Sequence, residues 1–252
     1  MAEQDFVALA ISKVHESFQV ASANAKRQQF AETYAGIGQG MRAVASALTN
    51  ANTAAKAATG AFDRNSKSCI ECRSGCSACC YQPVMATEAE VLLVANYVQL
   101  AFDAEAAAQV RSDVREYADR LREMGGERAG RTNQRCPMLR DGKCSVYAAR
   151  PFSCVMYNST SRATCETQFA LGERGEKDLG AIPVPALPIA VVGSMRDGFY
   201  AACVQRKLPM KSLNLALGLE IALNTPDALT RWMAGEDVFA QASMATLAKQ
   251  DA

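Results

Sequence analysis

The chain reads Cys69-Ile-Glu-Cys72-Arg-Ser-Gly-Cys76-Ser-Ala-Cys79-Cys80 over one short stretch, which holds five of its 10 cysteines. A second cluster contains Cys136, Cys144 and Cys154, and Cys165 lies just beyond it. The only histidine, His15, is far upstream. Because thiolate is the soft ligand that binds zinc and iron–sulphur clusters, the two clusters predict a metal bound through sulphur alone.

The composition is that of an ordinary globular chain of 252 residues, with 49% hydrophobic residues and a formal net charge of +1. This charge gives no electrostatic case for nucleic acid as a partner. The longest apolar run, from Val91 to Phe102, is too short to span a membrane, and the acidic N-terminus is not a secretory signal. We therefore expect a cytoplasmic protein, in which dense cysteines indicate metal or redox chemistry.

The N-terminal segment carries apolar residues at helical spacing, at Val7, Ile11, Val14 and Phe18. This stripe predicts amphipathic helices, and the glycines between residues 36 and 40 mark a turn between two of them. Residues 1–60 are therefore expected to form a helical hairpin. A coiled coil that binds a protein partner is the alternative interpretation.

The middle of the chain contains clear helix and turn signals. Thr87-Glu88-Ala89-Glu90 fits a capping box at the start of a helix, and Asp103 can cap a second helix that ends at Gly125-Gly126. Asp141-Gly142 favours a tight turn between Cys136 and Tyr147. This turn predicts a small hairpin that places Cys136 and Cys144 close together, with Val146 and Tyr147 in a strand.

The C-terminal third is expected to be helical. Leucines alternate from Leu213 to Leu219, which also suits a strand, but the neighbouring residues favour a helix. Thr225-Pro226-Asp227 predicts another helix start, with Thr225 as its cap. The fold class is therefore mainly α, a helical domain with a small β-hairpin and a cysteine-lined metal site. We expect the hairpin of residues 1–60, a metal-chelating domain at 61–170, and a helical region at 171–252 that packs on it.

The number of thiols exceeds the four ligands of one zinc site. Two metal centres, one centre with additional thiols, and an iron–sulphur cluster all remain open. In an extended segment the adjacent Cys79 and Cys80 would face opposite sides, so Cys80 is either a ligand or a small buried residue. No catalytic residue is predicted. The predicted metal ligands are Cys72, Cys76, Cys79, Cys80, Cys136, Cys144, Cys154 and Cys165.

Both clusters together resemble the YkgJ-type cysteine-cluster proteins, the zinc- or iron-chelating family named for its CxxCxxCC motif. The matching segments, which lie within residues 69–166, are Cys72-Arg-Ser-Gly-Cys76-Ser-Ala-Cys79-Cys80, Cys136-Pro137-Met138-Leu139, Cys144-Ser-Val-Tyr147 and Arg150-Pro151-Phe152-Ser153-Cys154. The first spacing here is Cys-x3-Cys rather than the usual Cys-x2-Cys. The resemblance implies a metal-chelating domain, and some relatives look like flagellin lysine methylases.

These observations lead to three functional hypotheses. The first is an iron–sulphur cluster or iron centre used in redox chemistry. The second is a zinc-stapled module whose N-terminal helices bind a protein partner. The third is an S-adenosylmethionine-dependent protein-modifying enzyme. In each case Arg150 can compensate thiolate charge or pair with Glu88 or Glu90, while Tyr147 and Tyr157 can shield the centre or simply pack in the core.

Overall fold

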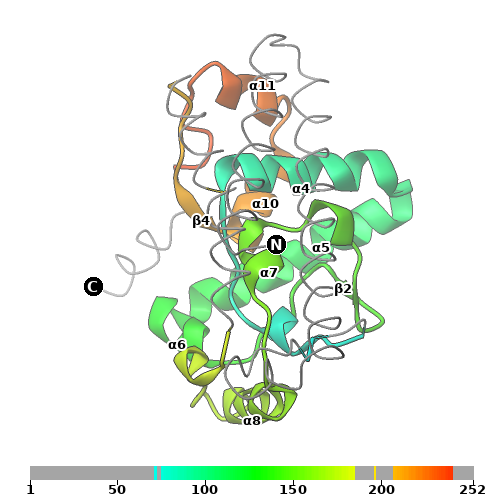
Figure 1. Ribbon diagram of the computed structural model, residues 1–252. Helices are drawn as coiled ribbons and strands as arrows, with labels where there is room; N and C mark the ends of the chain where they lie inside the picture. The colour runs from blue at the N-terminus through cyan, green and yellow to red at the C-terminus, as the bar shows by residue number, and fades with distance from the viewer. Residues whose placement is uncertain (1–70, 73–74, 185–195, 197–206, 241–252) are drawn as a thin grey trace, which may run out of the picture.

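The computed structural model describes residues 71–72, 75–184, 196 and 207–240 (Figure 1). Helix accounts for 57% of these residues and strand for 7%, which confirms the mainly α prediction. The predicted N-terminal hairpin, Cys69 and Cys203 lie outside the described residues. The three domain boundaries stay predictions.

The elements are short except for two central helices. In chain order they are η1 (Ala78–Tyr81), β1 (Met85–Thr87), α4 (Glu88–Ala101), α5 (Ala104–Met124), α6 (Gly126–Arg131), β2 (Leu139–Arg140), β3 (Lys143–Cys144), η2 (Tyr147–Ala149), α7 (Phe152–Met156), α8 (Arg162–Gly172), η3 (Leu179–Ala181), β4 (Ser212–Asn214), α10 (Leu215–Asn224) and α11 (Ala228–Met233).

The core lies where α10 packs against both α4 and α5 (Figure 1). Each of these helices contributes a buried apolar face, which includes Val91 and Val98 from α4, Val114 from α5 and Leu219 from α10. Gly218 permits the close approach, since a Cβ there would lie 2.8 Å from Val91 Cγ2. The segment after residue 207 is therefore part of the core that carries the cysteine-bearing elements.

The structure has two antiparallel strand pairs, of which the first joins distant parts of the chain and the second is a local hairpin. In the first, β1 pairs with β4, and Ala86 lies opposite Leu213. In the second, β2 pairs with β3 across Asp141 and Gly142, which both have positive φ. This confirms the small hairpin, although Val146 and Tyr147 do not continue it as a strand, because η2 begins at Tyr147.

Helix capping follows the sequence signals in α4 and α5. The Thr87 hydroxyl accepts the Glu90 amide, and Glu90 accepts the Thr87 amide in return, which completes the capping box. Asp103 caps α5, which ends at Gly125 with φ 71°. The predicted start of the last helix is wrong, because α11 begins at Ala228 with Asp227 in the left-handed region as its N-cap.

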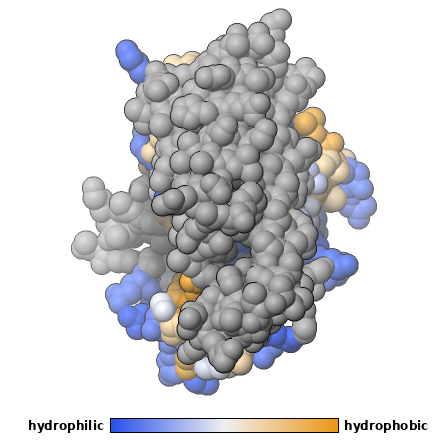
Figure 2. All heavy atoms as spheres, viewed as in Figure 1, coloured by the Kyte–Doolittle hydropathy of each residue, from blue (hydrophilic) through white to orange (hydrophobic). Residues whose placement is uncertain are grey.

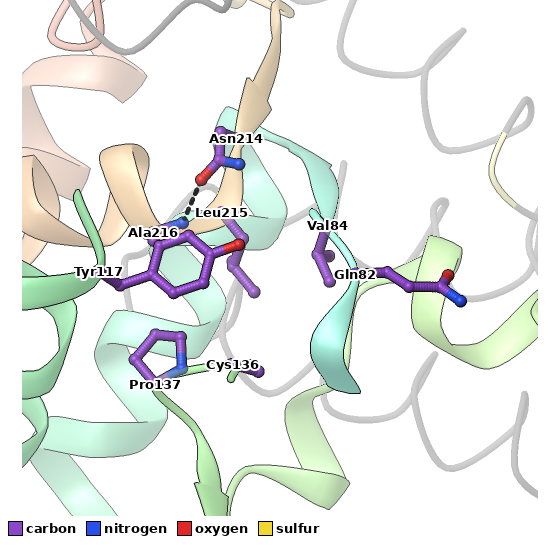
Figure 3. A pocket seen from close by; sticks show the side chains of 8 residues that line it. All are labelled: Gln82, Val84, Tyr117, Cys136, Pro137, Asn214, Leu215 and Ala216. Atoms are coloured by element: carbon purple, nitrogen blue, oxygen red, sulfur yellow. Dashed lines mark hydrogen bonds between the residues drawn. The ribbon is translucent and has the colours of Figure 1, made fainter. Parts of the chain in front are cut away.

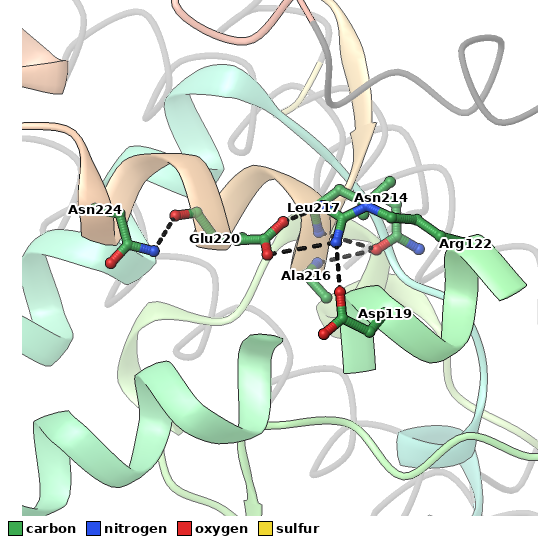
Figure 4. A network of polar contacts seen from close by, with 7 residues as sticks. All are labelled: Asp119, Arg122, Asn214, Ala216, Leu217, Glu220 and Asn224. Atoms are coloured by element: carbon green, nitrogen blue, oxygen red, sulfur yellow. Dashed lines mark hydrogen bonds and ion pairs between the residues drawn. The ribbon is translucent and has the colours of Figure 1, made fainter. Parts of the chain in front are cut away.

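The C-terminal leucine segment divides between strand and helix. Leu213 lies in β4 and Leu215 begins α10, so the helix prediction holds only from Leu215 onward. The pairing of β4 with β1 holds residues 212–214 extended. The side-chain oxygen of Asn214 then accepts the Ala216 and Leu217 amides and so caps the start of the helix (Figure 4). Arg122 on α5 then links Asp119 to Glu220 of α10, which fixes the two helices side by side (Figure 4).

Hydrophilic side chains form much of the described surface that is visible in Figure 2, and smaller hydrophobic areas lie between them. Only three large hydrophobic side chains are exposed among the described residues, namely Met85, Leu100 and Tyr147. No described helix is long and apolar enough to cross a membrane.

Candidate metal centre

Five separate parts of the fold carry the eight predicted ligands. Cys72 and Cys76 precede η1, which holds Cys79 and Cys80, while the rest come from the hairpin, α7 and α8. The segments meet because the Cys136 amide donates to the Cys80 carbonyl at 2.7 Å. Tyr81 also packs edge-on against Phe169 of α8, with ring centroids 4.8 Å apart. None of the eight cysteines forms a disulfide.

The first group of thiols, called the hairpin group below, comprises Cys136, Cys144 and Cys154. The Met138 amide donates to the Cys136 sulphur, and the Val146 amide donates to the Cys144 sulphur. In both cases the donor lies two residues after the cysteine. Hydrogen bonds from amides favour the anionic form of an acid, so these two bonds act to lower the pKa of Cys136 and Cys144.

Burial has the opposite effect on the hairpin group. It raises the pKa of Cys136 to about 12 and raises the pKa of Cys144 and Cys154, the last of them well above its ordinary value. Cys136 and Cys79 are the thiols that raise the pKa of Cys154 most after burial. Without a bound metal, burial therefore keeps these thiols protonated at neutral pH.

The second group, called the Ser159 group below, comprises Cys72, Cys76 and Cys165. The Ser159 amide donates to the Cys72 sulphur at 3.1 Å, and the Ser159 side chain forms a hydrogen bond with Cys165. Ser159 is only 2% exposed. Its carbonyl accepts the Glu71 amide at 2.9 Å, which holds the chain next to Cys72 in place.

Cys72 is exposed as a residue, yet partial burial of its sulphur raises its pKa. The exposure belongs mainly to the rest of the residue, because the Ser159 amide contacts the sulphur directly. The charges that raise the pKa of Cys72 further belong to Cys76, Cys79 and Cys165. The three members of the Ser159 group are therefore electrostatic neighbours.

Cys79 lies between the two groups. The hydrogen bond between its thiol and that of Cys80 raises the pKa of Cys79, and burial raises it further. The charge of Cys79 in turn acts on Cys72 and Cys165 of one group and on all three members of the other. The expectation of an extended Cys79-Cys80 segment is wrong, since both residues lie in the 3-10 helix η1.

Arg150 supplies positive charge to one side of the site. Its guanidinium carbon lies 3.7 Å from the centroid of the Tyr147 ring, and its charge lowers the pKa of Cys79, Cys144 and Cys154. The Arg150 Nε is buried without a hydrogen-bond partner. Arg150 forms no ion pair with another residue of the described part of the chain, so of the expected roles only charge compensation has support.

Lys177 is a functional candidate that the sequence did not reveal. It is 5% exposed, and its ammonium donates to the Tyr81 carbonyl at the end of η1, at 2.9 Å. Burial lowers the pKa of Lys177 to about 8. Lys177 lies within a run of charged residues, which gives no sequence signal for burial. Its position next to η1 follows from the path of the chain after α8.

The described thiols are the ligand type that a thiophilic metal prefers, but their side chains are too far apart to hold a metal ion. No three His, Cys, Asp or Glu side chains in residues 71–72, 75–184, 196 and 207–240 lie close enough to hold an ion. The backbone already brings the cysteine-bearing segments together. Chelation therefore needs the thiol side chains to turn toward one another.

A small cavity lies behind Cys136, between η1, α5 and the start of α10 (Figure 3). Its volume is about 10 Å³, which is the space of about one water molecule. Tyr117 and Asn214 line it, and burial together with the charge of Cys136 raises the pKa of Tyr117. The cavity is too small for an organic substrate or for S-adenosylmethionine.

The fold brings cysteine-bearing segments from distant parts of the chain next to one another, which is the arrangement that a thiolate metal-chelating domain needs. In agreement, residues 71–175 match the family model described as "CxxCxxCC: Putative zinc- or iron-chelating domain". The match confirms the resemblance predicted from the cysteines and supports zinc or iron as the bound metal. No curated protein and no solved structure matches the chain.

Proposed function

We propose that this chain binds an iron–sulphur cluster or an iron centre through its cysteines and uses it for electron transfer in the cytoplasm. The observation that carries the proposal is the number of free thiols that the fold gathers around Cys79, which exceeds what one zinc site needs. The placement of Arg150 beside three of these thiols adds support, because a fixed cation near a metal centre tunes its potential.

Analysis of iron, sulphide and zinc in anaerobically purified protein tests this proposal, together with visible absorption before and after reduction. We expect iron, and a sulphur-to-iron charge-transfer absorption that bleaches when the protein is reduced. Ser145→Ala is a matched control, because Ser145 lies in the hairpin and binds the Met138 carbonyl at 2.9 Å without being a predicted ligand. A colourless protein with stoichiometric zinc and no iron contradicts the proposal.

A second candidate function is a zinc-stapled interaction module. The observation that favours it is the hairpin itself, in which Cys136 and Cys144 each accept an amide from two residues ahead and pack against the core. In that case the metal contributes directly to folding, and the N-terminal segment is the proposed binding site for a protein partner. If zinc chelation leaves the melting temperature unchanged, this candidate fails.

A further inference from the structure

The segment that begins with Glu71 and Cys72, called the first cysteine segment below, is docked on the start of α8. The Glu71 amide donates to the Ser159 carbonyl at 2.9 Å, and the Ser159 amide donates to the Cys72 sulphur at 3.1 Å. One carboxylate oxygen of Glu71 accepts the Arg162 amide at 2.6 Å. These bonds join parts of the chain that are far apart in the sequence, so the fold brings them together.

The Glu71 carboxylate satisfies a backbone group at the start of α8. Arg162 is the first residue of this helix, and an amide at that position has no acceptor within its own helix. The helix dipole also favours a negative charge there. The local cap acts elsewhere, because the Ser161 hydroxyl accepts the Thr164 amide at 3.1 Å. Glu71 therefore supplies an acceptor that the local cap does not.

The contact between Glu71 and α8 is made to the backbone of the helix. The Arg162 guanidinium binds Glu166 at 2.6 Å, one turn further along. Cys165 lies in the first turn of the same helix. The docking contact of Glu71 therefore brings Cys72 to the end of α8 that carries Cys165.

Hydrogen bonds, rather than burial, hold the first cysteine segment at this place. Glu71 and Cys72 are both exposed, so apolar packing does not fix them. Their partner Ser159 is 2% exposed, and its hydroxyl binds the Ser161 amide and carbonyl, each at 3.0 Å. An exposed segment thus rests on a fixed partner, and its position depends on the bonds that dock it.

We infer that Glu71 is a positioning residue, whose carboxylate docks the first cysteine segment on α8 and so determines where the Cys72 sulphur lies. Chelation needs the thiols to turn toward one another, and a docked backbone leaves only the side chain of Cys72 to be ordered. Ordering less of the chain on binding costs less free energy. The inference rests on the metal binding that the proposed function includes, but not on iron as the metal.

Amide hydrogen exchange followed by NMR, on the full-length protein without metal, tests where Cys72 lies. In Glu71→Ala the first cysteine segment loses its contact with the Arg162 amide. The Ser159 amide then loses the Cys72 sulphur as its acceptor and should exchange on the order of tenfold faster, as expected for local opening. The amide of Val98 in the core should keep its wild-type rate, which separates this effect from a general loss of stability.

Two further variants act as controls. Glu71→Gln keeps a side-chain oxygen that can accept the Arg162 amide, so it should retain most of the protection of Ser159. Glu116→Ala is the matched control, because Glu116 is an exposed glutamate whose ion pair with Arg120 lies within α5. It should exchange like the wild type. Far-UV circular dichroism checks that each variant folds.

Zinc titration against a competing chelator is the second readout. The zinc affinity of Glu71→Ala should fall by on the order of tenfold, a loss typical of residues that support metal ligands without binding the metal. The affinities of Glu71→Gln and Glu116→Ala should stay near that of the wild type.

The outcomes keep this inference separate from the proposed function. Wild-type protection of Ser159 in Glu71→Ala overturns the inference. Faster exchange of Ser159 with an unchanged zinc affinity also overturns it, because the position of Cys72 then has no effect on chelation. A native protein that contains zinc and no iron contradicts the proposed function, whereas a positioning role of Glu71 stands in that case.

Discussion

Glu90 connects the start of α4 with the start of α7, and its removal should destabilise the protein strongly. One carboxylate oxygen accepts the Thr87 amide and hydroxyl, each at 2.7 Å, and the other accepts the Phe152 amide at 2.6 Å. The side chain is 2% exposed. Burial raises the pKa of Glu90, although these three donors act in the opposite direction.

Glu90→Ala strands two buried amide donors, those of Thr87 and Phe152. A buried donor that loses its partner costs about 1–3 kcal/mol, so with two such donors the free energy of unfolding should fall by roughly 2–6 kcal/mol. Thr87→Ala is the matched comparison, because it removes the cap hydroxyl and keeps the Phe152 bond. It should cost only about 1 kcal/mol, the usual value for a lost N-cap.

Urea denaturation followed by circular dichroism measures both variants, with the metal content of each sample held equal. Phe152 lies two residues before Cys154, so Glu90→Ala should also weaken metal binding more than Thr87→Ala does. If Glu90→Ala costs no more than Thr87→Ala, the bond to Phe152 contributes nothing and the reasoning about α7 is refuted.

Four further predictions concern packing, charge and metal. Gly218→Ala forces a Cβ against Val91 and should lower the free energy of unfolding, measured by urea denaturation, by about 1–3 kcal/mol. Gly130→Ala, with open space around it, should be neutral or stabilise by about 0.5–1 kcal/mol. Equal effects of the two substitutions would contradict the close approach of α10 to α4. Arg150→Gln should lower the reduction potential of the metal centre by on the order of tens of millivolts, with Arg150→Lys closer to wild type, and an unchanged potential in voltammetry would argue against charge compensation. The pKa of Lys177, about 8 in the folded protein, lies below its unfolded value, so its contribution to stability rises with pH above about 8. Lys177→Met should remove that rise in the metal-free protein. Parallel plots of the free energy of unfolding against pH for the two proteins would oppose this. Metal removal should lower stability by roughly 4 kcal/mol where the free metal had been a thousandfold above its Kd, and metal affinity should rise with pH because bound thiols release protons, which isothermal titration at several pH values checks.

The local signals were sufficient for much of the fold. The capping box at Thr87, the cap at Asp103 and the Asp141-Gly142 turn depend on residues within a few positions of one another, and they predicted two helices and the hairpin. The start of α11 was missed because Asp227 adopts a left-handed conformation, for which the preceding Thr-Pro pair carries no signal. The split at Asn214 was also missed, because pairing of β4 with β1 decides it over a long distance.

The sequence by itself determined the type of metal ligand. Cysteine is the ligand residue that clusters in the two motifs, and thiolate favours zinc or iron. The tertiary structure alone decided how the thiols are grouped. Ser159 binds Cys72, the charge of Arg150 acts on Cys79, and Lys177 binds the Tyr81 carbonyl. These interactions connect residues far apart in the sequence and leave no periodic or spaced pattern in the chain. The dense run of cysteines around residues 72–80 is therefore divided by its partners in the fold, with Cys79 between them.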